Sequence, residues 1–366
     1  MMKTAVCGVW HVHAGDYTKH ALALGEVLGF WEEDDALAEQ FRSVFPIPRF
    51  ESLEALLESD AEGVIVCTET SEHIHVMPKI AAAGKHIFTE KVLALTSADC
   101  GTIEKAVEDN GVTFTISMPH KTMAPHNAVK AVVSSGELGK INYLRFRNCH
   151  SGSTRGWLPV HFYDEAQCGG GAMIDLGAHG MYLTHWILGL PVTAKSAFTV
   201  SHDTPKNIDL VEDNAVTVMT FADGAIAINE TGFVSEYSPL VLEVSGEQGF
   251  VKMEGKTVVK CTSATEGKTV EVPLGEDLPL PIVQFLKGQV LSGYGMEEAK
   301  ALTKLMEMAP SAKVMTVTAL SSTRSMFLGV SWATVKADLA ATGIPRSQWV
   351  RYMPWAPRSI MAPPPH

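Results

Sequence analysis

The first 118 residues alternate short apolar runs with longer segments of helical character, and this alternation limits the fold more than any other feature of the chain. It is typical of βαβ units, in which helices cover a sheet of parallel strands. We expect strands at Thr4–Val9, Glu26–Trp31, Gly63–Thr68, His86–Thr89 and Thr113–Ser117. Helical spacing occurs at Ala36–Phe41, Leu53–Ser59 and Met77–Ala83. The sequence therefore predicts an α/β Rossmann-type domain over residues 1–118.

The pattern changes after Pro119. A helix at Pro125–Ser135 and a strand at Lys140–Arg147 precede a polar loop, a glycine run and a second helix. Apolar alternation then predicts strands at Ala215–Phe221, Ala225–Glu230, Leu240–Ser245 and Thr257–Thr262, followed by a helix at Met296–Ala309. Asp223-Gly224 is a hairpin signal between the first two of these strands. We predict an α+β domain over residues 119–312 with a large open, mainly antiparallel sheet.

The composition changes again at the C-terminal end. From residue 314 onward there is one acid, Asp338, against five bases, and the chain closes on Pro363-Pro364-Pro365. We expect a helix at Phe327–Ala341 followed by a loose tail. Residues 313–366 are interpreted as an atypical extension, either specific to this lineage or translated in a shifted reading frame.

The overall charge indicates the kind of partner. A formal net charge of −12 argues against nonspecific binding to nucleic acid or to anionic membranes, because both need a basic surface. The six cysteines lie far apart without a CxxC pair, and the N-terminus has no signal-peptide pattern. We therefore expect a cytoplasmic protein with reduced thiols and a small-molecule partner.

The first predicted strand leads into Gly8–His13, with the sequence GVWHVH, where a dinucleotide-binding fold carries G-x-G-x-x-G. Gly8 permits the tight turn, whereas Trp10 and His13 replace the other two glycines. We expect Gly8, Trp10, His11 and Val12 to contact the cofactor.

Four acids, Glu32-Glu33-Asp34-Asp35, follow the second predicted strand. A carboxylate here can accept hydrogen bonds from the adenosine ribose, and Glu32 is the expected residue, although an acidic helix N-terminus is an alternative reading. We expect no arginine nearby, so that these acids would repel a 2′-phosphate. NAD is therefore predicted in preference to NADP.

Two segments carry a more specific signal: GKHIFTEK at Gly84–Lys91 and GGGAMIDLGAH at Gly169–His179. The first resembles the Glu-Lys-Pro segment of the Gfo/Idh/MocA family of oxidoreductases, and the second resembles that family's glycine-rich Asp-x-Gly-x-His helix. Further segments are similar to the family at Ser134–Lys140, Glu212–Ala215 and Pro281–Phe285. The resemblance covers about residues 3 to 309.

The resemblance implies that Glu90 helps to hold the cofactor and that Lys91, Asp175 and His179 form the catalytic site. Oxidation of an alcohol by hydride transfer needs a base for the hydroxyl proton, and His179 is the expected base. Lys91 would stabilise the developing alkoxide. Asp175 and His179 are four residues apart, so on an α-helix they share one face.

The chain also departs from the family pattern. Val92 replaces the proline after Glu-Lys, and Tyr182 stands where many members carry an acid. The segment TSEHIH at Thr70–His75 resembles a Thr-Pro-Asn-x-x-His loop but keeps only Thr70 and His75, which we expect to contact the cofactor.

Substrate specificity is expected from two further segments. The loop His150–Tyr163 contains Arg155, Trp157 and His161, and a second segment contains His120-Lys121. Each of these is read as a substrate contact, although each also fits an ordinary polar loop.

The resemblance predicts an NAD-dependent oxidoreductase that acts on a hydroxyl of a sugar, polyol or inositol. The open sheet has a face or edge to cover, so we expect a homodimer or homotetramer. One alternative is a non-catalytic nucleotide or sugar sensor of the same fold. Another is a metal-dependent amidohydrolase barrel with a His11-x-His13 metal pair, which needs eight βα units. Its further candidate ligands are His73, His75, Lys91, Asp175 and His179.

Overall fold

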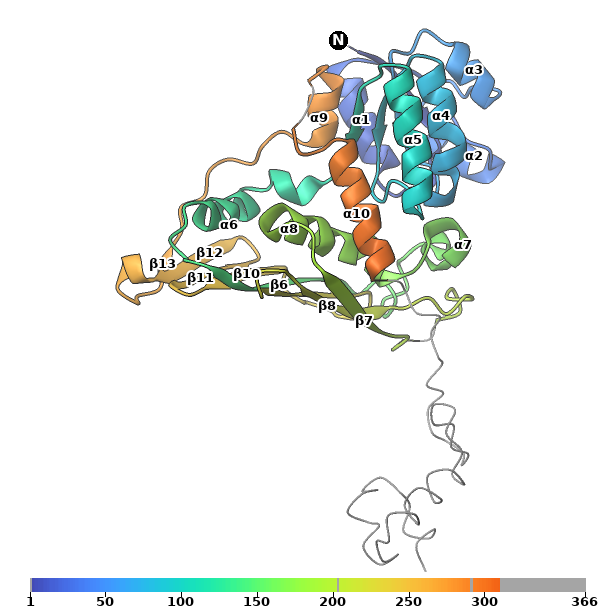
Figure 1. Ribbon diagram of the computed structural model, residues 1–366. Coiled ribbons are helices and arrows are strands. Elements are labelled where there is room, and N and C mark those ends of the chain that lie inside the picture. Colours follow the sequence, from blue (N-terminus) through green and yellow to red (C-terminus); the bar gives the residue numbers. More distant parts are fainter. Residues whose placement is uncertain (1, 203, 290–291, 310–366) are drawn as a thin grey trace, which may run out of the picture. The chain divides into compact units, whose positions relative to one another are not determined.

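The structure is a computed structural model that describes residues 2–202, 204–289 and 292–309 (Figure 1). A five-stranded parallel sheet forms the N-terminal part, in the order β2-β1-β3-β4-β5. Its strands are β1 (Lys3–Cys7), β2 (Glu26–Trp31), β3 (Gly63–Val66), β4 (His86–Thr89) and β5 (Phe114–Ile116). This confirms the Rossmann-type fold.

Helices connect these parallel strands, as parallel pairing requires. They are α1 (Ala14–Leu24), α2 (Asp35–Val44), α3 (Leu53–Glu58), α4 (His73–Ala82) and α5 (Ser97–Asp109). Three of them begin at a side-chain cap: Asp34 for α2, Ser52 for α3 and Thr96 for α5. All four residues of β3 are buried, as expected for a strand covered on both faces.

An eight-stranded sheet follows, in the order β13-β12-β11-β10-β6-β9-β8-β7. Its strands are β6 (Ile141–Cys149), β7 (Thr193–Thr199), β8 (Asn214–Thr220), β9 (Ile226–Gly232), β10 (Val241–Gly246), β11 (Gly249–Glu254), β12 (Thr257–Thr262) and β13 (Val270–Glu271). The pairs are antiparallel except for β6 with β9. The predicted hairpin at Asp223-Gly224 joins β8 to β9, so the prediction of a mainly antiparallel sheet is confirmed.

The remaining helices lie between the two sheets or beside the first (Figure 1). They are α6 (Ala124–Ser134), α7 (Glu165–Cys168), α8 (Ala178–Leu188), α9 (Pro281–Leu286) and α10 (Met296–Met308). Helix α8 contacts β6 and β9 of the large sheet, and α10 contacts both α8 and α5. Helix α10 therefore joins the parts of the molecule that carry the two sheets.

Short helical turns complete the described chain. They lie at Thr70–Glu72, Pro119–Thr122, Val160–Tyr163 and Ser263–Thr265, with a π-helical turn at Met173–Gly177 directly before α8. Within the described residues, every helix is too short or too polar to cross a lipid bilayer. The predicted helix Phe327–Ala341 and the extension 313–366 lie outside the described residues.

Candidate active site

The turn after β1 depends on glycine. Gly8 has φ +78°, and a Cβ at this position would lie 2.4 Å from Thr68 Cγ2. Its N–H donates to the carbonyl oxygen of Trp31 at the end of β2 (2.8 Å). Only a residue without a side chain fits both the left-handed conformation and the contact with Thr68.

Trp10 reaches from this turn to the part of the chain that carries the large sheet. Its Nε1–H donates to Gln167 Oε1 (2.6 Å), and its ring lies 5.6 Å from Phe162 and 4.6 Å from His161 between centroids. The second glycine of the dinucleotide motif is thus replaced by a tryptophan. Its side chain joins the Rossmann-type domain to the part of the chain that carries the large sheet, and a cleft lies between these two halves of the molecule. Val12, by contrast, is 52% exposed.

Glu32 lies at the end of β2, close to the same turn. Its carboxylate accepts hydrogen bonds from the N–H groups of Val9 (2.7 Å) and Asp34 (3.0 Å). Arg49 donates to the carbonyl oxygen of Glu32 (2.7 Å) and pairs with Asp35 (2.7 Å). The expectation that no arginine lies near is therefore wrong, because the chain returns alongside β2 after α2.

Glu90, after β4, is buried beneath the turn. Tyr17 donates its hydroxyl to Oε1, and the N–H of Lys91 donates to Oε2 (3.1 Å). Burial raises the pKa of Glu90, but the nearby His11, His13 and Lys91 lower it overall. The ligand atoms of His11, His13 and Glu90 lie within 4.8 Å of one another, a spacing from which a metal ion could be held.

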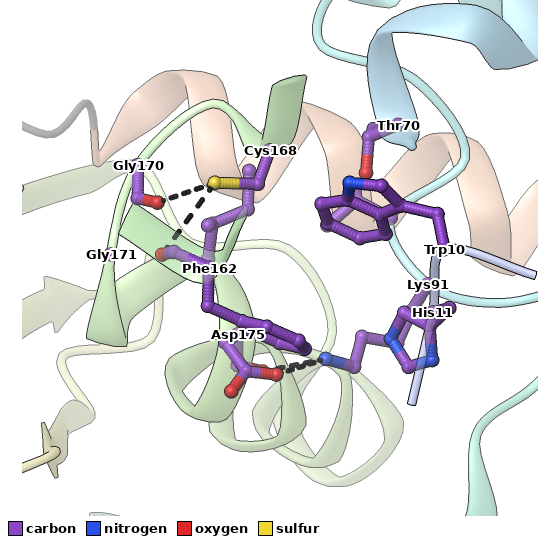
Figure 2. A pocket seen from close by; sticks show the side chains of 11 residues that line it. Trp10, His11, Thr70, Lys91, Phe162, Cys168, Gly170, Gly171 and Asp175 are labelled. Atoms are coloured by element: carbon purple, nitrogen blue, oxygen red, sulfur yellow. Dashed lines mark hydrogen bonds and ion pairs between the residues drawn. The ribbon is translucent and has the colours of Figure 1, made fainter. Parts of the chain in front are cut away.

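Lys91 and Asp175 form a buried ion pair across the cleft (Figure 2). Lys91 Nζ donates to Asp175 Oδ1 (2.8 Å) and to the Asp175 carbonyl oxygen (2.9 Å). The two side chains are 5% and 18% exposed. Burial raises the pKa of Asp175, yet the adjacent ammonium outweighs burial and lowers it overall. The pair therefore presents an ammonium held beside a carboxylate.

Glu212 fixes the backbone of the segment that leads to Asp175. Glu212 accepts hydrogen bonds from the N–H groups of Gly171 (3.1 Å) and Met173 (3.0 Å). A Cβ on Gly171 would lie 2.0 Å from the Glu212 carbonyl oxygen, so the glycine run lets these segments approach closely. Asp175 lies in the π-helical turn and His179 in α8, so the two do not share one regular α-helix.

His179 is held by aromatic neighbours. Its Nδ1 lies 2.9 Å from the Tyr182 hydroxyl, and its ring stacks on that of His120 with centroids 4.3 Å apart. Burial, followed by the proximity of His120 and Lys91, lowers the pKa of His179 well below that of an ordinary histidine. The imidazole is therefore neutral at physiological pH.

A pocket lies between these groups. Residues from both halves line it, including Trp10, His11, Thr70, Lys91, Phe162 and Asp175. Figure 2 shows the Lys91–Asp175 pair beside Phe162, with Trp10 on the opposite wall. Its lining offers a buried ammonium on Lys91, the carboxylate of Asp175 and the imidazole of His11, whose pKa burial lowers to about 4.

Two family descriptions match the chain. An oxidoreductase family with an NAD-binding Rossmann fold matches residues 2–118, and the GFO/IDH/MocA C-terminal domain matches residues 126–252. The chain belongs to the Gfo/Idh/MocA family of oxidoreductases.

Individual relatives share less than a third of their residues with this Gfo/Idh/MocA protein over the aligned segments. An uncharacterized oxidoreductase of Bacillus subtilis is 29% identical over 53% of this chain and 55% of its own length. A scyllo-inositol 2-dehydrogenase (NAD(+)) of the same organism is 28% identical over 54% of this chain and 56% of its own length. The chain thus spans just over half the length of these relatives.

A solved structure shows the same fold. The WlbA dehydrogenase from Bordetella pertussis, in complex with NADH and UDP-GlcNAcA, matches with a TM-score of 0.67 and 16% identity. The match covers 84% of this chain and 94% of that chain. At this identity the likeness concerns the fold alone.

Some residues predicted as contacts lie away from this pocket. Lys121 is buried in a second cavity, where its ammonium lies 4.7 Å from the Tyr294 ring centroid. Arg155 pairs with Glu236 at the surface, and Trp157 is 55% exposed. His75 is exposed on α4. Their roles as cofactor or substrate contacts stay predictions.

Other residues line the pocket without having been singled out, although Phe162 lies in the loop His150–Tyr163 from which substrate contacts were expected. Phe162 and Cys168 form part of its wall, and Gln167 holds Trp10. An apolar ring, a thiol with a raised pKa caused by burial and an amide carry no motif that sequence reasoning could use. The nearest signal was their position just before the glycine run.

The amidohydrolase alternative is wrong about the fold. The described residues form one open parallel sheet and one mainly antiparallel sheet, whereas that enzyme class needs a closed barrel of eight βα units. The His11-x-His13 pair does lie close to Glu90, but in the turn after β1 of a Rossmann-type domain.

Proposed function

We propose that this protein is an NAD-dependent oxidoreductase that transfers a hydride between a nicotinamide cofactor and a CH–OH or carbonyl group of a sugar, polyol or inositol. Membership of the family supports the reaction class, and the inositol dehydrogenase relative supports the substrate class. The observation that carries the proposal is the buried Lys91–Asp175 pair next to the turn after β1.

The turn fits a dinucleotide in three respects. Gly8 keeps the tight conformation, and no side chain caps the N-terminus of α1, where a pyrophosphate could bind. Glu32 stands at the end of β2, where a ribose hydroxyl would donate to it. When bound, the nicotinamide supplies or accepts the hydride.

The charges also fit an oxidised nicotinamide. Glu90 and Asp175 contribute two negative charges against the single positive charge of Lys91. A buried site with net negative charge attracts the positively charged ring of oxidised NAD more than the neutral reduced ring. Lys91 and His179 would flank the reacting oxygen and share the tasks of binding it and exchanging its proton.

The first test is NADH formation with a panel of sugars, polyols and inositols. We expect at least one of them to be oxidised, and Lys91→Ala and His179→Ala each to lower turnover by at least about a hundredfold. Lys79→Ala, on the outer part of α4, is the matched control and should retain activity. Circular dichroism would show that the variants remain folded.

Near-normal turnover in Lys91→Ala would contradict the assignment. Binding of a nucleotide or sugar without any NADH across the panel would instead support the non-catalytic sensor.

A further inference from the structure

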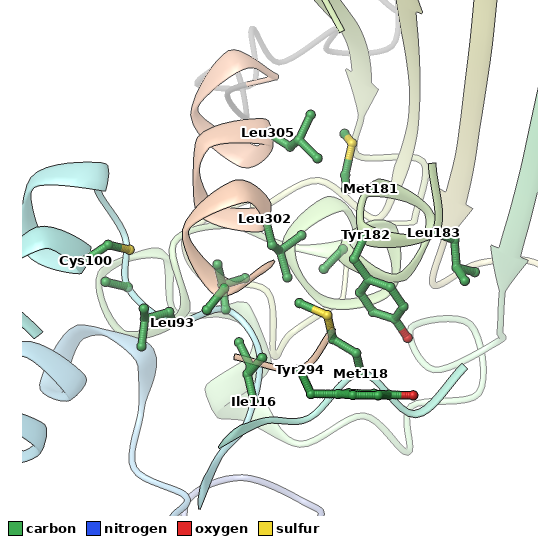
Figure 3. Packing of buried hydrophobic residues seen from close by; sticks show 14 of the residues in the cluster. Leu93, Cys100, Ile116, Met118, Met181, Tyr182, Leu183, Tyr294, Leu302 and Leu305 are labelled. Carbon is green, nitrogen blue, oxygen red and sulfur yellow. The ribbon is translucent and has the colours of Figure 1, made fainter. Parts of the chain in front are cut away.

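Tyr182 shares its hydroxyl between two neighbours. The residue belongs to α8, is 2% exposed and lies within the buried cluster drawn in Figure 3. Its oxygen accepts the backbone N–H of His120 (3.1 Å) and lies 2.9 Å from His179 Nδ1. Tyr182 therefore links His179 to the turn that follows β5.

These two contacts restrict where the protons lie. The His120 N–H can only donate, so the phenol oxygen accepts that bond and keeps its own proton to give. Among the described residues, His179 Nδ1 is the acceptor in hydrogen-bonding contact with this hydroxyl. A buried hydroxyl is costly to leave without an acceptor. In the neutral imidazole Nδ1 then accepts, and Nε2 carries the proton.

The surroundings keep this imidazole neutral. Positively charged or ionisable groups face it from several elements: Tyr182 on α8, His120 in the turn after β5, His126 on α6, Lys91 after β4 and His13 before α1. A second positive charge beside Lys91 would be repelled, and the nearest hydrogen-bonding partner is a phenol without charge. No carboxylate among the described residues is hydrogen-bonded to His179.

We propose that Tyr182 is a positioning residue that holds His179 as a neutral hydrogen-bond donor, so that Lys91, rather than His179, exchanges the proton with substrate. This inference rests on the function proposed above. His179 Nε2–H would donate to the reacting oxygen and stabilise its negative charge, a role that needs no change of protonation.

The step balances with the groups already named. In the reducing direction the carbonyl carbon accepts a hydride from reduced nicotinamide, and the C=O π electrons move onto oxygen. That oxygen takes a proton from Lys91 Nζ, which becomes a neutral amine, while His179 keeps its proton. In the oxidising direction the neutral amine of Lys91 accepts the hydroxyl proton. Asp175, 2.8 Å from Nζ, positions the group in both directions.

Nitrogen-15 NMR of histidine-labelled protein tests the tautomer without any substrate. His179 is assigned by the signals that disappear in His179→Gln. We expect an unprotonated Nδ1, a protonated Nε2 and no titration between about pH 5 and 8, where an ordinary histidine titrates. In Tyr182→Phe the preference for one tautomer should be lost. Tyr294→Phe is the matched control, since this buried tyrosine lines the same second cavity as Tyr182.

Kinetics test the consequence. Tyr182→Phe should lower kcat about fivefold to tenfold, the size of one neutral hydrogen bond, whereas Tyr294→Phe should not. The kcat/KM profile of the wild-type protein should lack a step near pH 6.5. If the enzyme turns over but Nδ1 of His179 is protonated, or His179 titrates near pH 6.5, the inference about Tyr182 and Lys91 is wrong while the proposed function stands. The expected tautomer in a protein without turnover would instead reject the proposed function.

Discussion

Several histidines of this protein are buried without a charge partner, which makes stability sensitive to acid. Burial lowers the pKa of His126 to about 4, and neither of its ring nitrogens has a hydrogen-bond partner within the described residues. Because the folded-state pKa lies below the unfolded value, protonation favours unfolding. The contribution of His126 to stability is therefore constant above about pH 6.5 and falls as the pH drops from there toward the folded pKa.

The test is the substitution His126→Leu. The wild-type protein should lose up to about 3 kcal/mol of unfolding free energy through His126 on acidification, the value of a shift of between two and three pKa units. The variant should lack this loss. Urea unfolding at pH 7 and pH 4.5 measures the difference. His20→Leu, at a partly exposed position on α1, is the control. An unchanged pH dependence in His126→Leu would show that His126 is not charged on unfolding.

Single residues of the site were predictable only where they belong to a sequence motif with a known chemical role. Lys91 and Asp175 follow from their segments, and the structure brings them to 2.8 Å. The wall formed by Phe162 and Cys168 was not predictable, because apolar side chains near a cleft look like any other core residues. The environment of His179 depends on His120, which is distant in sequence, so no local pattern signals the loss of its basicity.

The turn after β1 requires glycine at position 8. Gly8→Ala places a methyl group 2.4 Å from Thr68 Cγ2 in a left-handed conformation. The conformation alone costs roughly 1–2 kcal/mol, and the contact adds to it. We expect a lower melting temperature and loss of measurable NAD binding by calorimetry.

Gly84→Ala is the matched comparison for this turn. Its φ is also positive, at +71°, but nothing lies within 4 Å of the added Cβ. It should therefore lose stability by the conformational cost alone and retain NAD binding. Equal affinity for NAD in Gly8→Ala and wild type would remove this turn from the cofactor site.

The end of β2 carries the expected preference for NAD over NADP. Glu32→Ala should weaken NAD at least about tenfold, the value of a hydrogen bond to a charged group, and should weaken nicotinamide mononucleotide far less. Glu33→Ala, its exposed neighbour, is the control. Arg49 lies close by, so equal wild-type affinity for NAD and NADP would show that it compensates for the acid.

Elements were predictable where the sequence holds a short apolar run or a regular apolar alternation. The limits expected for the strands at Glu26–Trp31, His86–Thr89 and Thr257–Thr262 agree with β2, β4 and β12. The edge strand β7 was missed because none of its side chains is fully buried, so its apolar alternation is weak. Helix α5 was also missed, although its Thr96 cap and the spacing of Cys100, Ile103 and Val107 are readable signals.

Taken as a whole, the molecule exposes an apolar stripe on its large sheet. Val216, Val218 and Ile226 are 39%, 40% and 41% exposed on β8 and β9. We expect this face to be covered in a homodimer or homotetramer. Val218→Glu should lower the sedimentation mass, while Val44→Glu, at an exposed position on α2, should not. A wild-type mass that stays monomeric at all concentrations would exclude self-association.

The limits expected for the domains, at residues 118 and 312, also stay predictions.

The bridge made by Trp10 gives the protein an internal optical reporter. The indole lies on the turn expected to receive the cofactor, yet its N–H is held by Gln167 and its face by Phe162. Any ligand that shifts this turn must change the polarity around the ring, and indole emission responds to polarity. We therefore expect cofactor binding to change the emission of Trp10, a signal that is isolated by subtracting the spectrum of Trp10→Phe.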